Sequence, residues 1–214
     1  MVIKNKDDLI WLLTACNRKR YFTEIENLDI SAITDLFSLF DGCNNLIHID
    51  LSKWDMSNVI NMQFMFGNCF NLRSIDLSNW NVSKVKNMIR LFSSCHFIEQ
   101  LDLSKWDMSN VEDISCMFYR CRNLRTLDLS KWNTSNIKGM ESAFELCECL
   151  QTVNLSNWDM SKVERIGFMF ADCVNLKNLC LFNINYPYEL HTYDHPFLRC
   201  DSLNAIDILL LTLN

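Results

Sequence analysis

Three groups of side chains in this sequence have types that could do chemistry, and the first resembles a hydrolase triad. His48, Asp50 and Ser52 alternate along one stretch, and a histidine, an aspartate and a serine are the side chains of such a triad. Alternate residues of a strand lie roughly 7 Å apart, whereas triad partners must be within hydrogen-bond reach. The spacing therefore argues against catalysis by these three residues.

The second group is a pair of histidines near the C-terminus. His191 and His195 stand four residues apart, so one face of a helix would bring both to a shared metal ion. A metal site needs three or four ligands, and Pro187 and Pro196 bracket the pair and favour a loop. We expect a capping loop without a metal here, and a metal-dependent enzyme that uses residues 186–195 is the alternative.

The third group consists of 11 cysteines. The odd count does not fit a disulfide framework, and Cys147 and Cys149 are too close together for the usual zinc knuckle. A free cysteine packs as a small apolar side chain. We therefore expect reduced thiols that fill the core, and no cofactor. Six of the cysteines recur at a fixed interval: Cys43, Cys69, Cys95, Cys121, Cys147 and Cys173.

The elements that position all of these residues follow from the same interval. Five tryptophans are each 26 residues apart, namely Trp54, Trp80, Trp106, Trp132 and Trp158. A fixed period in the twenties is typical of a solenoid, because so short a unit cannot bury its apolar face alone and must stack on its neighbours. No Pro-rich or Gly-rich linker interrupts the 214 residues, so we expect one elongated domain with the tryptophans in its core.

Each unit has two halves with different apolar periods. In the first half, the stretch Ile75-Asp76-Leu77-Ser78 alternates between apolar and polar residues, as a short strand does. In the second half, Val59, Met62, Met65 and Cys69 recur at steps of three to four residues, which is the spacing of a helix with one buried stripe. The sequence thus predicts an α/β solenoid of about seven 26-residue strand–helix coils with a parallel sheet on one face. The predicted helix caps are Ser57, Ser83, Ser109, Ser135 and Ser161.

The repeat also resembles a known family. Leu124, Leu127 and Leu129 follow the pattern Leu-x-x-[Ile/Leu]-x-Leu of leucine-rich repeats. The next segment, Trp-[Asp/Asn]-x-Ser-x-Val-x-x-Met-x-x-Met-Phe-x-x-Cys, resembles the BspA-like repeats of bacterial surface proteins, which mycoplasma lipoproteins also contain. The resemblance covers residues 28 to about 208. It implies adhesion to, and recognition of, other proteins at a cell surface.

The N-terminal residues 1–27 are expected to form a capping helix and a connector, with Asn5 as the helix cap. The stretch Leu13-Thr14-Ala15-Cys16 also matches a bacterial lipobox, in which the cysteine is lipidated after export. Asp7 and Asp8 interrupt the basic region that an export signal needs, and its apolar run is short. We therefore expect a cytoplasmic protein, with export to the cell surface as the alternative.

The C-terminal part departs from the repeat. The solenoid is expected to span residues 28–208, with an atypical coil at 182–200, because terminal units usually cap the stack. The apolar tail 209–214 then either folds back on the last coil or meets another chain. Homo-oligomerisation through this edge is one predicted role of the tail.

Composition narrows the classes of partner. The net charge of −6 does not supply the basic surface that nucleic-acid binding needs. No run approaches the roughly 20 apolar residues of a membrane span. An acidic chain is compatible with a basic protein partner.

Acidic side chains form a column along the predicted sheet. Asp50, Asp76, Asp102 and Asp128 occupy the same strand position in successive coils. Neighbouring strands lie about 4.8 Å apart, so like charges repel by roughly 1 kcal/mol per pair even in water. Either the column is structural, with each carboxylate bonded to a serine of the adjacent coil and balanced by nearby lysines, or it forms an acidic concave surface for a basic partner.

We therefore predict a non-enzymatic protein-interaction module that binds a partner on the concave sheet face, because solenoids present extended binding surfaces. An exported adhesin or effector of the BspA-like kind is the alternative. The candidate partner-binding residues are His48, Asp50, Lys53, Asp76, Gln100, Asp102, Lys105, Thr126, Asp128 and Lys131.

Overall fold

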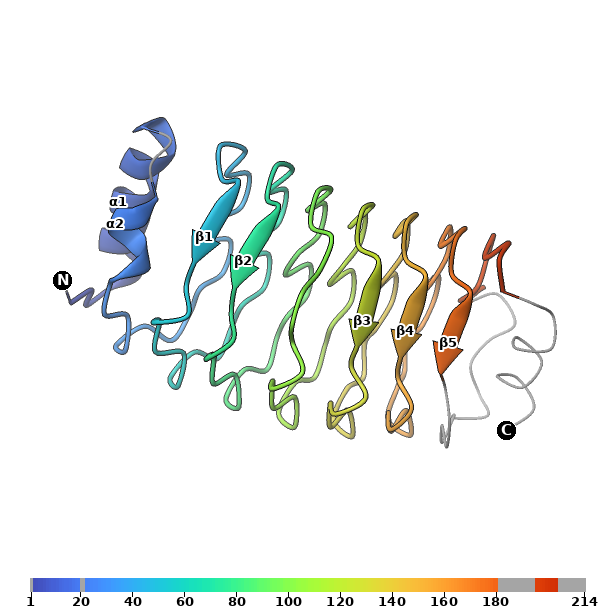
Figure 1. The fold of residues 1–214 in the computed structure, drawn as a ribbon. Coiled ribbons are helices and arrows are strands. Elements are labelled where there is room, and N and C mark those ends of the chain that lie inside the picture. Colours follow the sequence, from blue (N-terminus) through green and yellow to red (C-terminus); the bar gives the residue numbers. More distant parts are fainter. Residues whose placement is uncertain (1, 20–21, 181–194, 204–214) are drawn as a thin grey trace.

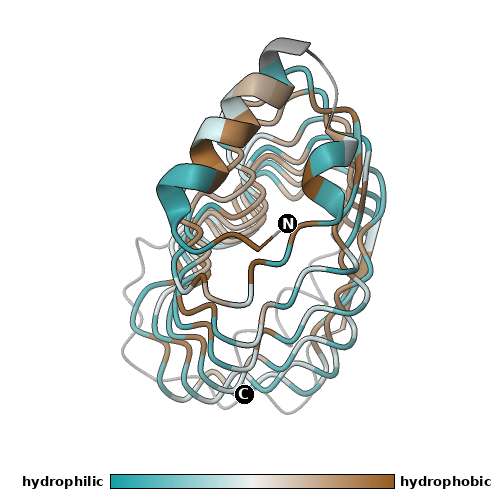
Figure 2. Cartoon of the chain, turned by 90° about the vertical axis from the view of Figure 1, so that its left-hand side faces the viewer, coloured by the Kyte–Doolittle hydropathy of each residue, from teal (hydrophilic) through white to brown (hydrophobic). Residues whose placement is uncertain are grey.

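The computed structural model describes residues 2–19, 22–180 and 195–203. Its coils stand side by side in one nearly straight row, with two helices at the N-terminal end (Figure 1). Viewed along the row, successive coils overlie one another as loops of similar outline (Figure 2). The repeat therefore forms stacked coils. Their number, predicted as about seven, depends partly on residues outside the described ranges, as does the tail 209–214.

The helix α1, Lys6–Lys19, begins where the sequence predicts a capped helix. Asn5 Oδ1 accepts a hydrogen bond from the Asp8 amide at 2.9 Å and so caps the first turn, while Asn5 Nδ2 donates to Asp8 Oδ2 at 2.9 Å and holds the capping side chain in place. Leu9, Leu13 and Cys16 are buried on one side of the helix. Together with the short helix α2, Thr23–Glu26, α1 covers the first coil.

Short parallel strands line one side of the row, which we call the strand face (Figure 1). They pair at a register of one coil, for example Ile49 with Ile75 and Leu127 with Val153. The predicted parallel sheet is thus present, but it is divided into a sheet of β1 and β2 and a sheet of β3, β4 and β5. The strands are β1 His48–Asp50, β2 Ser74–Asp76, β3 Thr126–Asp128, β4 Thr152–Asn154 and β5 Asn178–Cys180.

In the coils that the structure describes throughout, the second half is not helical, which corrects the prediction of strand–helix coils. In the segment 59–69, the amides of Met65 and Cys69 donate to carbonyls three residues earlier, at 3.1 and 3.3 Å. The residue before each donor, Phe64 or Asn68, has a positive φ of 59° or 54°. This combination is the pattern of consecutive type II turns. The predicted burial was right, because Val59, Met62, Met65 and Cys69 are all buried.

The spacing of the coils explains why turns replace helices. Stacked phenylalanine rings in successive coils have centroids 4.8–6.0 Å apart, whereas packed helices need about 8–10 Å between their axes. Alternate amides instead bond to the next coil, as Met62 does to the Asn87 carbonyl at 3.0 Å and Phe66 to the Leu91 carbonyl at 2.9 Å. Without bulkier helices on one side, nothing curves the row toward the strands, so the face predicted to be concave belongs to a nearly straight row.

Aspartate and asparagine side chains close the corners of the coils. Asp55 Oδ1 accepts the Ser57 amide at 2.9 Å, and Asn61 Oδ1 accepts the Gln63 amide at 3.0 Å. Each bond forms an Asx turn, in which a side chain bonds to the backbone two residues later. The serines predicted as helix caps are therefore turn residues.

Candidate functional site

An open depression of about 450 Å³ lies on the strand face over β1 and β2. Four carboxylates line it, one each from α2, β1, β2 and the following coil: Glu26, Asp50, Asp76 and Asp102. The other lining residues are His48, Ile49, Ser74, Ile75, Leu77 and Ser78. We call this depression the acidic groove. It brings together four of the predicted site residues, namely His48, Asp50, Asp76 and Asp102.

The aspartates of the groove are held by their own coils. Asp50 Oδ1 accepts the Ser52 amide and Asp76 Oδ1 accepts the Ser78 amide, both at 2.9 Å. The sequence-based interpretation placed this serine on the adjacent coil, but a side chain reaches the backbone two residues ahead more easily than it reaches the next coil. No hydrogen bond to the Oδ2 atom of Asp50 or Asp76 occurs among the described residues, so one oxygen of each remains available.

Serine contacts lower the pKa of three of the column's four carboxylates, Asp50, Asp102 and Asp128, and the first two of these line the groove. The Ser104 hydroxyl and amide hold the pKa of Asp102 below its usual value, with smaller contributions from the nearby charges of Lys105 and Lys131. The Ser52 side chain and amide lower the pKa of Asp50 in the same way, with a smaller contribution from Lys53. The groove is therefore negatively charged at neutral pH.

The lysines predicted for the site lie outside the groove lining. Lys53 Nζ donates to Asn27 Oδ1 at 2.7 Å, which ties its coil to the preceding one. Lys105 and Lys131 act on the aspartates only through their charges. The lysine charges add only a smaller lowering of the aspartate pKa values to that of the serine contacts, and none of the lysines lines the groove.

Three predicted residues lie further along the row. Gln100 forms an isolated bridge with Thr126 in β3, and Asp128 ends the same strand. Beyond β3 the column loses its charge, because Asn154 and Cys180 take the place of aspartate. The negative charge of the column is thus concentrated in the N-terminal part of the strand face.

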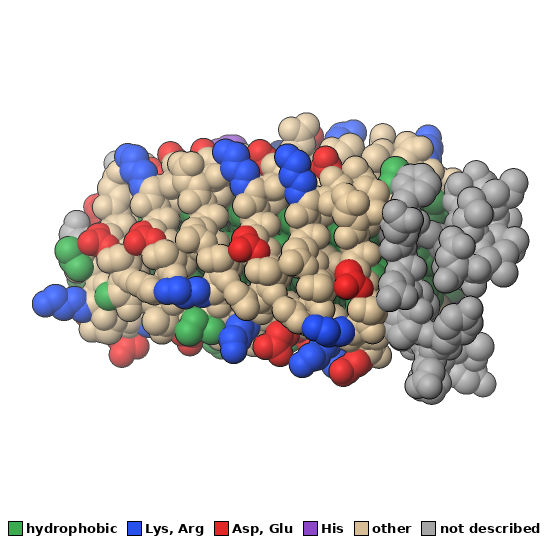
Figure 3. Space-filling model, turned by 90° about the horizontal axis from the view of Figure 1, so that it is seen from below, with side chains coloured by type: hydrophobic (Ala, Val, Ile, Leu, Met, Phe, Trp, Pro, Cys, Tyr) green, Lys and Arg blue, Asp and Glu red, His purple; other side chains and the backbone are tan. Residues whose placement is uncertain are grey.

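The face seen from below in Figure 3 does not show such a concentration of negative charge. Acidic and basic side chains are interspersed along the row there. Mixed signs partly cancel at a distance, whereas the groove gathers carboxylates in one hollow. The acidic groove is therefore a local feature and not a consequence of the net charge of −6 alone.

The structure pairs His48 with a serine of the neighbouring strand and not with Ser52. His48 Nδ1 lies 2.6 Å from Ser74 Oγ on the neighbouring strand, while Asp50 bonds to the Ser52 amide. A serine–histidine pair needs a carboxylate to orient the ring and donors for an oxyanion. No hydrogen bond from the ring to a carboxylate occurs in the described part of the chain.

Six residues that line the groove were not among the predicted site residues, and Ser74 and Glu26 are two of them. Ser74 takes the position of His48 one coil later, so counting 26 residues on from His48 would have identified it. Glu26 belongs to α2, outside the repeat, and reaches the groove because its Oε1 accepts the Asp50 amide at 3.2 Å. Only the fold could place Glu26 there.

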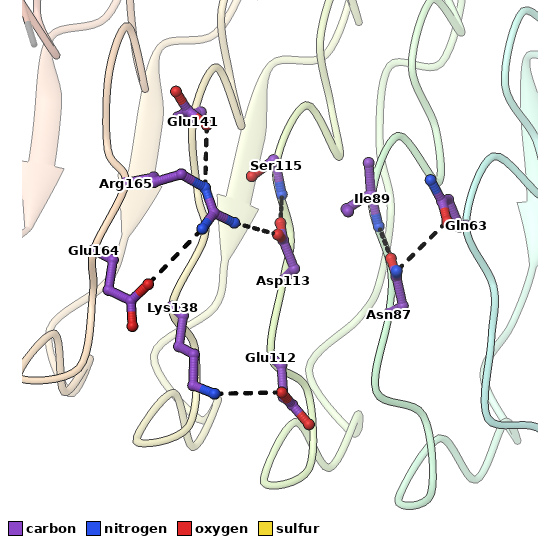
Figure 4. A network of polar contacts seen from close by, with 10 residues as sticks. All are labelled: Gln63, Asn87, Ile89, Glu112, Asp113, Ser115, Lys138, Glu141, Glu164 and Arg165. Carbon is purple, nitrogen blue, oxygen red and sulfur yellow. Dashed lines mark hydrogen bonds and ion pairs between the residues drawn. The ribbon is translucent and has the colours of Figure 1, made fainter.

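A second polar cluster lies on the side opposite the strand face (Figure 4). Arg165 Nη2 reaches across two coils to Asp113 Oδ2 at 2.6 Å, and Arg165 Nε lies 3.3 Å from Glu141 Oε2. Gly139 stands between them, and a Cβ atom there would collide with the Arg165 guanidinium and the Asp113 carboxylate. This glycine makes room for an ion pair that ties three coils together.

Metal ligands do not gather in the described part of the chain, where no group of three or more His, Cys, Asp or Glu side chains could hold an ion. His191 lies outside the described residues, as do Tyr193 and Asp194. The His195 ring lies 6.5 Å from the Phe168 ring.

Among the described helices, none is long and apolar enough to cross a membrane.

One protein family matches most of the chain. Its profile, described as "Mycoplasma protein of unknown function, DUF285", matches residues 9–104 and 91–204. The chain belongs to the DUF285 family. Together with the fold, this match supports repeats of the leucine-rich kind for the DUF285 chain, while the BspA-like branch remains a prediction.

One solved structure with a similar fold is that of a leucine-rich repeat protein. The T. pallidum leucine-rich repeat protein TpLRR aligns with the DUF285 chain at a TM-score of 0.59 and 19% identity, over 85% of this chain and 77% of that one. TLR13 in its complex with ssRNA13 aligns at a TM-score of 0.39 and 20% identity, over 82% of this chain and 27% of that one, a similarity too low for any inference. A comparison with curated proteins finds no match. At this identity, TpLRR shows the fold alone.

Proposed function

We propose that this DUF285 protein is a non-enzymatic protein-interaction module whose strand face binds a basic segment of a partner protein in the acidic groove. The observation that carries the proposal is the groove itself, in which Glu26, Asp50, Asp76 and Asp102 surround one open hollow. Stacked coils present an extended surface, and charge complementarity speeds and orients encounter with a partner of opposite charge.

The arrangement of hydrogen bonds leaves the groove aspartates able to bind a partner. Each groove aspartate uses Oδ1 for its own turn, at 2.9 to 3.1 Å from a serine amide. A carboxylate can accept several hydrogen bonds, so Oδ2 can receive a lysine or arginine of the partner without breaking the turn. The structural and functional interpretations of the aspartate column are therefore compatible.

The experiment is a pull-down from lysate and surface fractions of the source cell. It compares the wild type with a variant that carries Asp50→Asn, Asp76→Asn and Asp102→Asn. Asparagine keeps the Oδ1 acceptor of the turn and removes the charge, so the variant should stay folded. We expect it to lose the partner that the wild type retains, by tenfold or more in captured amount, roughly what the loss of charge-assisted hydrogen bonds predicts.

A matched control carries Asp29→Asn, Asp55→Asn and Asp107→Asn. These three exposed aspartates make the same turn to Ser31, Ser57 and Ser109 but do not line the groove. The control should capture the partner as the wild type does. Equal capture by all three proteins, each folded by circular dichroism, would make the acidic groove structural and reject the proposal.

We also propose that the protein acts inside the cell, with export as a surface adhesin as the alternative. Cleavage in front of Cys16 would remove Ile3, Leu9 and Leu13, which are buried, and so would uncover the first coil. The N-terminus of the chain isolated from its source cell distinguishes the two. A chain that begins with a lipid-modified Cys16 would establish export, and one that retains Leu9 would support the intracellular role.

A further inference from the structure

The strand layer is interrupted between the coil of β2 and the coil that follows it, which carries no strand in Figure 1. Residues 74–78 and 100–104 are all described, yet no backbone hydrogen bond joins them. At three other boundaries a leucine amide donates to the next coil: Leu51 to Asp76 at 3.2 Å, Leu129 to Asn154 at 3.0 Å and Leu155 to Cys180 at 2.9 Å. We call the boundary between residues 70–80 and 96–106 the seam.

Side-chain hydrogen bonds are missing at the seam as well. The indole nitrogens of the other repeat tryptophans each donate to a carbonyl of the preceding coil, as Trp80 does to Leu51 at 2.8 Å and Trp132 to Leu103 at 3.0 Å. The Trp106 indole nitrogen is buried and has no partner, although the equivalent acceptor would be the Leu77 carbonyl. A buried donor without an acceptor is unfavourable, so the missing bond favours rearrangement of the seam.

The sequence differs at this boundary. Asn71 Nδ2 donates to the Asn44 carbonyl at 2.9 Å, and Asn175 Nδ2 donates to the Glu148 carbonyl at 2.7 Å, so at these two places an asparagine at this repeat position bonds two coils together. At the seam the position holds Phe97, whose ring cannot donate such a bond. The Arg73 guanidinium lies 4.8 Å from the ring centroid instead.

The opposite side of the coils remains bonded. Met88 donates to the Asp113 carbonyl at 3.0 Å and Phe92 to the Met117 carbonyl at 2.9 Å. The Trp80 and Trp106 rings inside the core also stay stacked, 6.1 Å apart. The separation is therefore confined to the strand layer, and the continuous hydrogen-bond ladder opposite it can serve as the axis of a hinge.

The acidic groove straddles the seam, because Asp76 lies on one side of it and Asp102 on the other. We propose that the seam is a hinge at which the strand layer opens, and that a cationic segment bound across Asp76 and Asp102 closes it. At this boundary no backbone ladder offsets the repulsion between the two carboxylates. A lysine or arginine between them attracts both, so the net electrostatic interaction becomes favourable. The closing step rests on the proposed function, whereas the hinge does not.

The first experiment measures amide hydrogen exchange in the free, full-length protein. The amides of Leu77 and Glu99 would cross the seam if the ladder were complete, and their counterparts at bonded boundaries are Leu129 and Arg125. We expect Leu77 and Glu99 to exchange at least about tenfold faster than those counterparts, because local opening sets the rate. Equal protection of both pairs would overturn the hinge.

The second experiment introduces an asparagine at the seam. Phe97→Asn supplies a donor for the Phe70 carbonyl, and Phe97→Ala is the matched control that removes the ring without adding a donor. We expect Phe97→Asn, and not Phe97→Ala, to slow the exchange of Leu77 and Glu99 by about tenfold. The same exchange rates in both variants would show that Phe97 does not keep the seam open.

The third experiment adds a short lysine homopeptide to the free protein. It should slow the exchange of Leu77 and Glu99 in the wild type and leave it unchanged in an Asp76→Asn, Asp102→Asn variant. A fast-exchanging seam that the peptide does not slow would reject closure and retain the hinge. Loss of the pull-down difference, with a fast seam, would reject the proposed function alone.

Discussion

At the scale of single residues, the repeated cysteines act as neutral hydrogen-bond donors. Cys69 Sγ donates to the Phe40 carbonyl at 3.0 Å, and Cys95 Sγ donates to the Phe66 carbonyl at 3.2 Å. Burial raises the pKa of Cys43 and of Cys121 to about 12. A thiol with so high a pKa keeps its proton at neutral pH, so it can donate and is a poor nucleophile.

We predict that a thiol-specific reagent modifies only three of the eleven cysteines in the folded protein. Cys116, Cys149 and Cys180 are partly exposed, whereas the other eight are buried. The measurement is peptide mass spectrometry after a short maleimide pulse, with the same pulse in guanidinium as the control that labels every cysteine. Labelling of Cys95 or Cys121 in the folded chain would contradict the buried assignment.

At the scale of elements, the apolar pattern predicted burial better than backbone conformation. A step of three to four residues fits a helix stripe and also fits a series of four-residue turns, since both bring every third or fourth side chain to the core. The choice depends on the amide partners, which lie about one coil away, as with Phe64 and the Ile89 carbonyl at 2.9 Å. A local pattern contains no information about that distance.

Gly139 provides a test of the contacts between these turn segments. We predict that Gly139→Ala displaces Arg165 from Asp113 and lowers the free energy of unfolding by about 1 kcal/mol or less, because the ion pair is partly exposed and a Gly→Ala change also restricts the unfolded chain. Chemical denaturation measures the change. In an Arg165→Ala background the same substitution should cost less, and equal costs in both backgrounds would contradict the coupling.

At the scale of the whole molecule, aromatic columns link every coil to its neighbours. Phe118 is fully buried, with ring centroids 6.0 Å from Phe92 and 5.3 Å from Phe144. Because the apolar core contacts of a coil are mainly with its neighbours, the stability of a solenoid is approximately a sum of units and their interfaces. Damage in one coil should therefore spread to the adjoining coils.

We predict that Phe118→Asp unfolds several coils together, because it leaves an unpaired charge in a shared core and costs more than about 4 kcal/mol. Loss of circular dichroism and of hydrogen-exchange protection in the coils around residue 118 would show this. Phe168→Asp, at a side chain that is 41% exposed, is the control and should remain folded. A soluble, fully folded Phe118→Asp protein would mean that the buried face is wrongly assigned.

The candidate site was predictable in part. The column of Asp50, Asp76 and Asp102 follows from the period alone, because parallel strands one coil apart place equivalent residues side by side. Glu26 could not be predicted, since it lies outside the repeat and meets Asp50 only through the packing of α2 on the first coil. Lys53, Lys105 and Lys131 share one repeat position, as the aspartates do, but they lie outside the groove lining.

The period of 26 residues established which side chains are buried, that the coils stack, and which residues share a face, because stacking equivalent units repeats one pattern of burial. The tertiary structure was needed to show that turns replace helices, that the row is nearly straight and that the strand layer parts beside Phe97. These features depend on hydrogen bonds between residues about 25 to 29 positions apart. Whether such bonds form is set by the distance between coils, which the packing of the whole core determines.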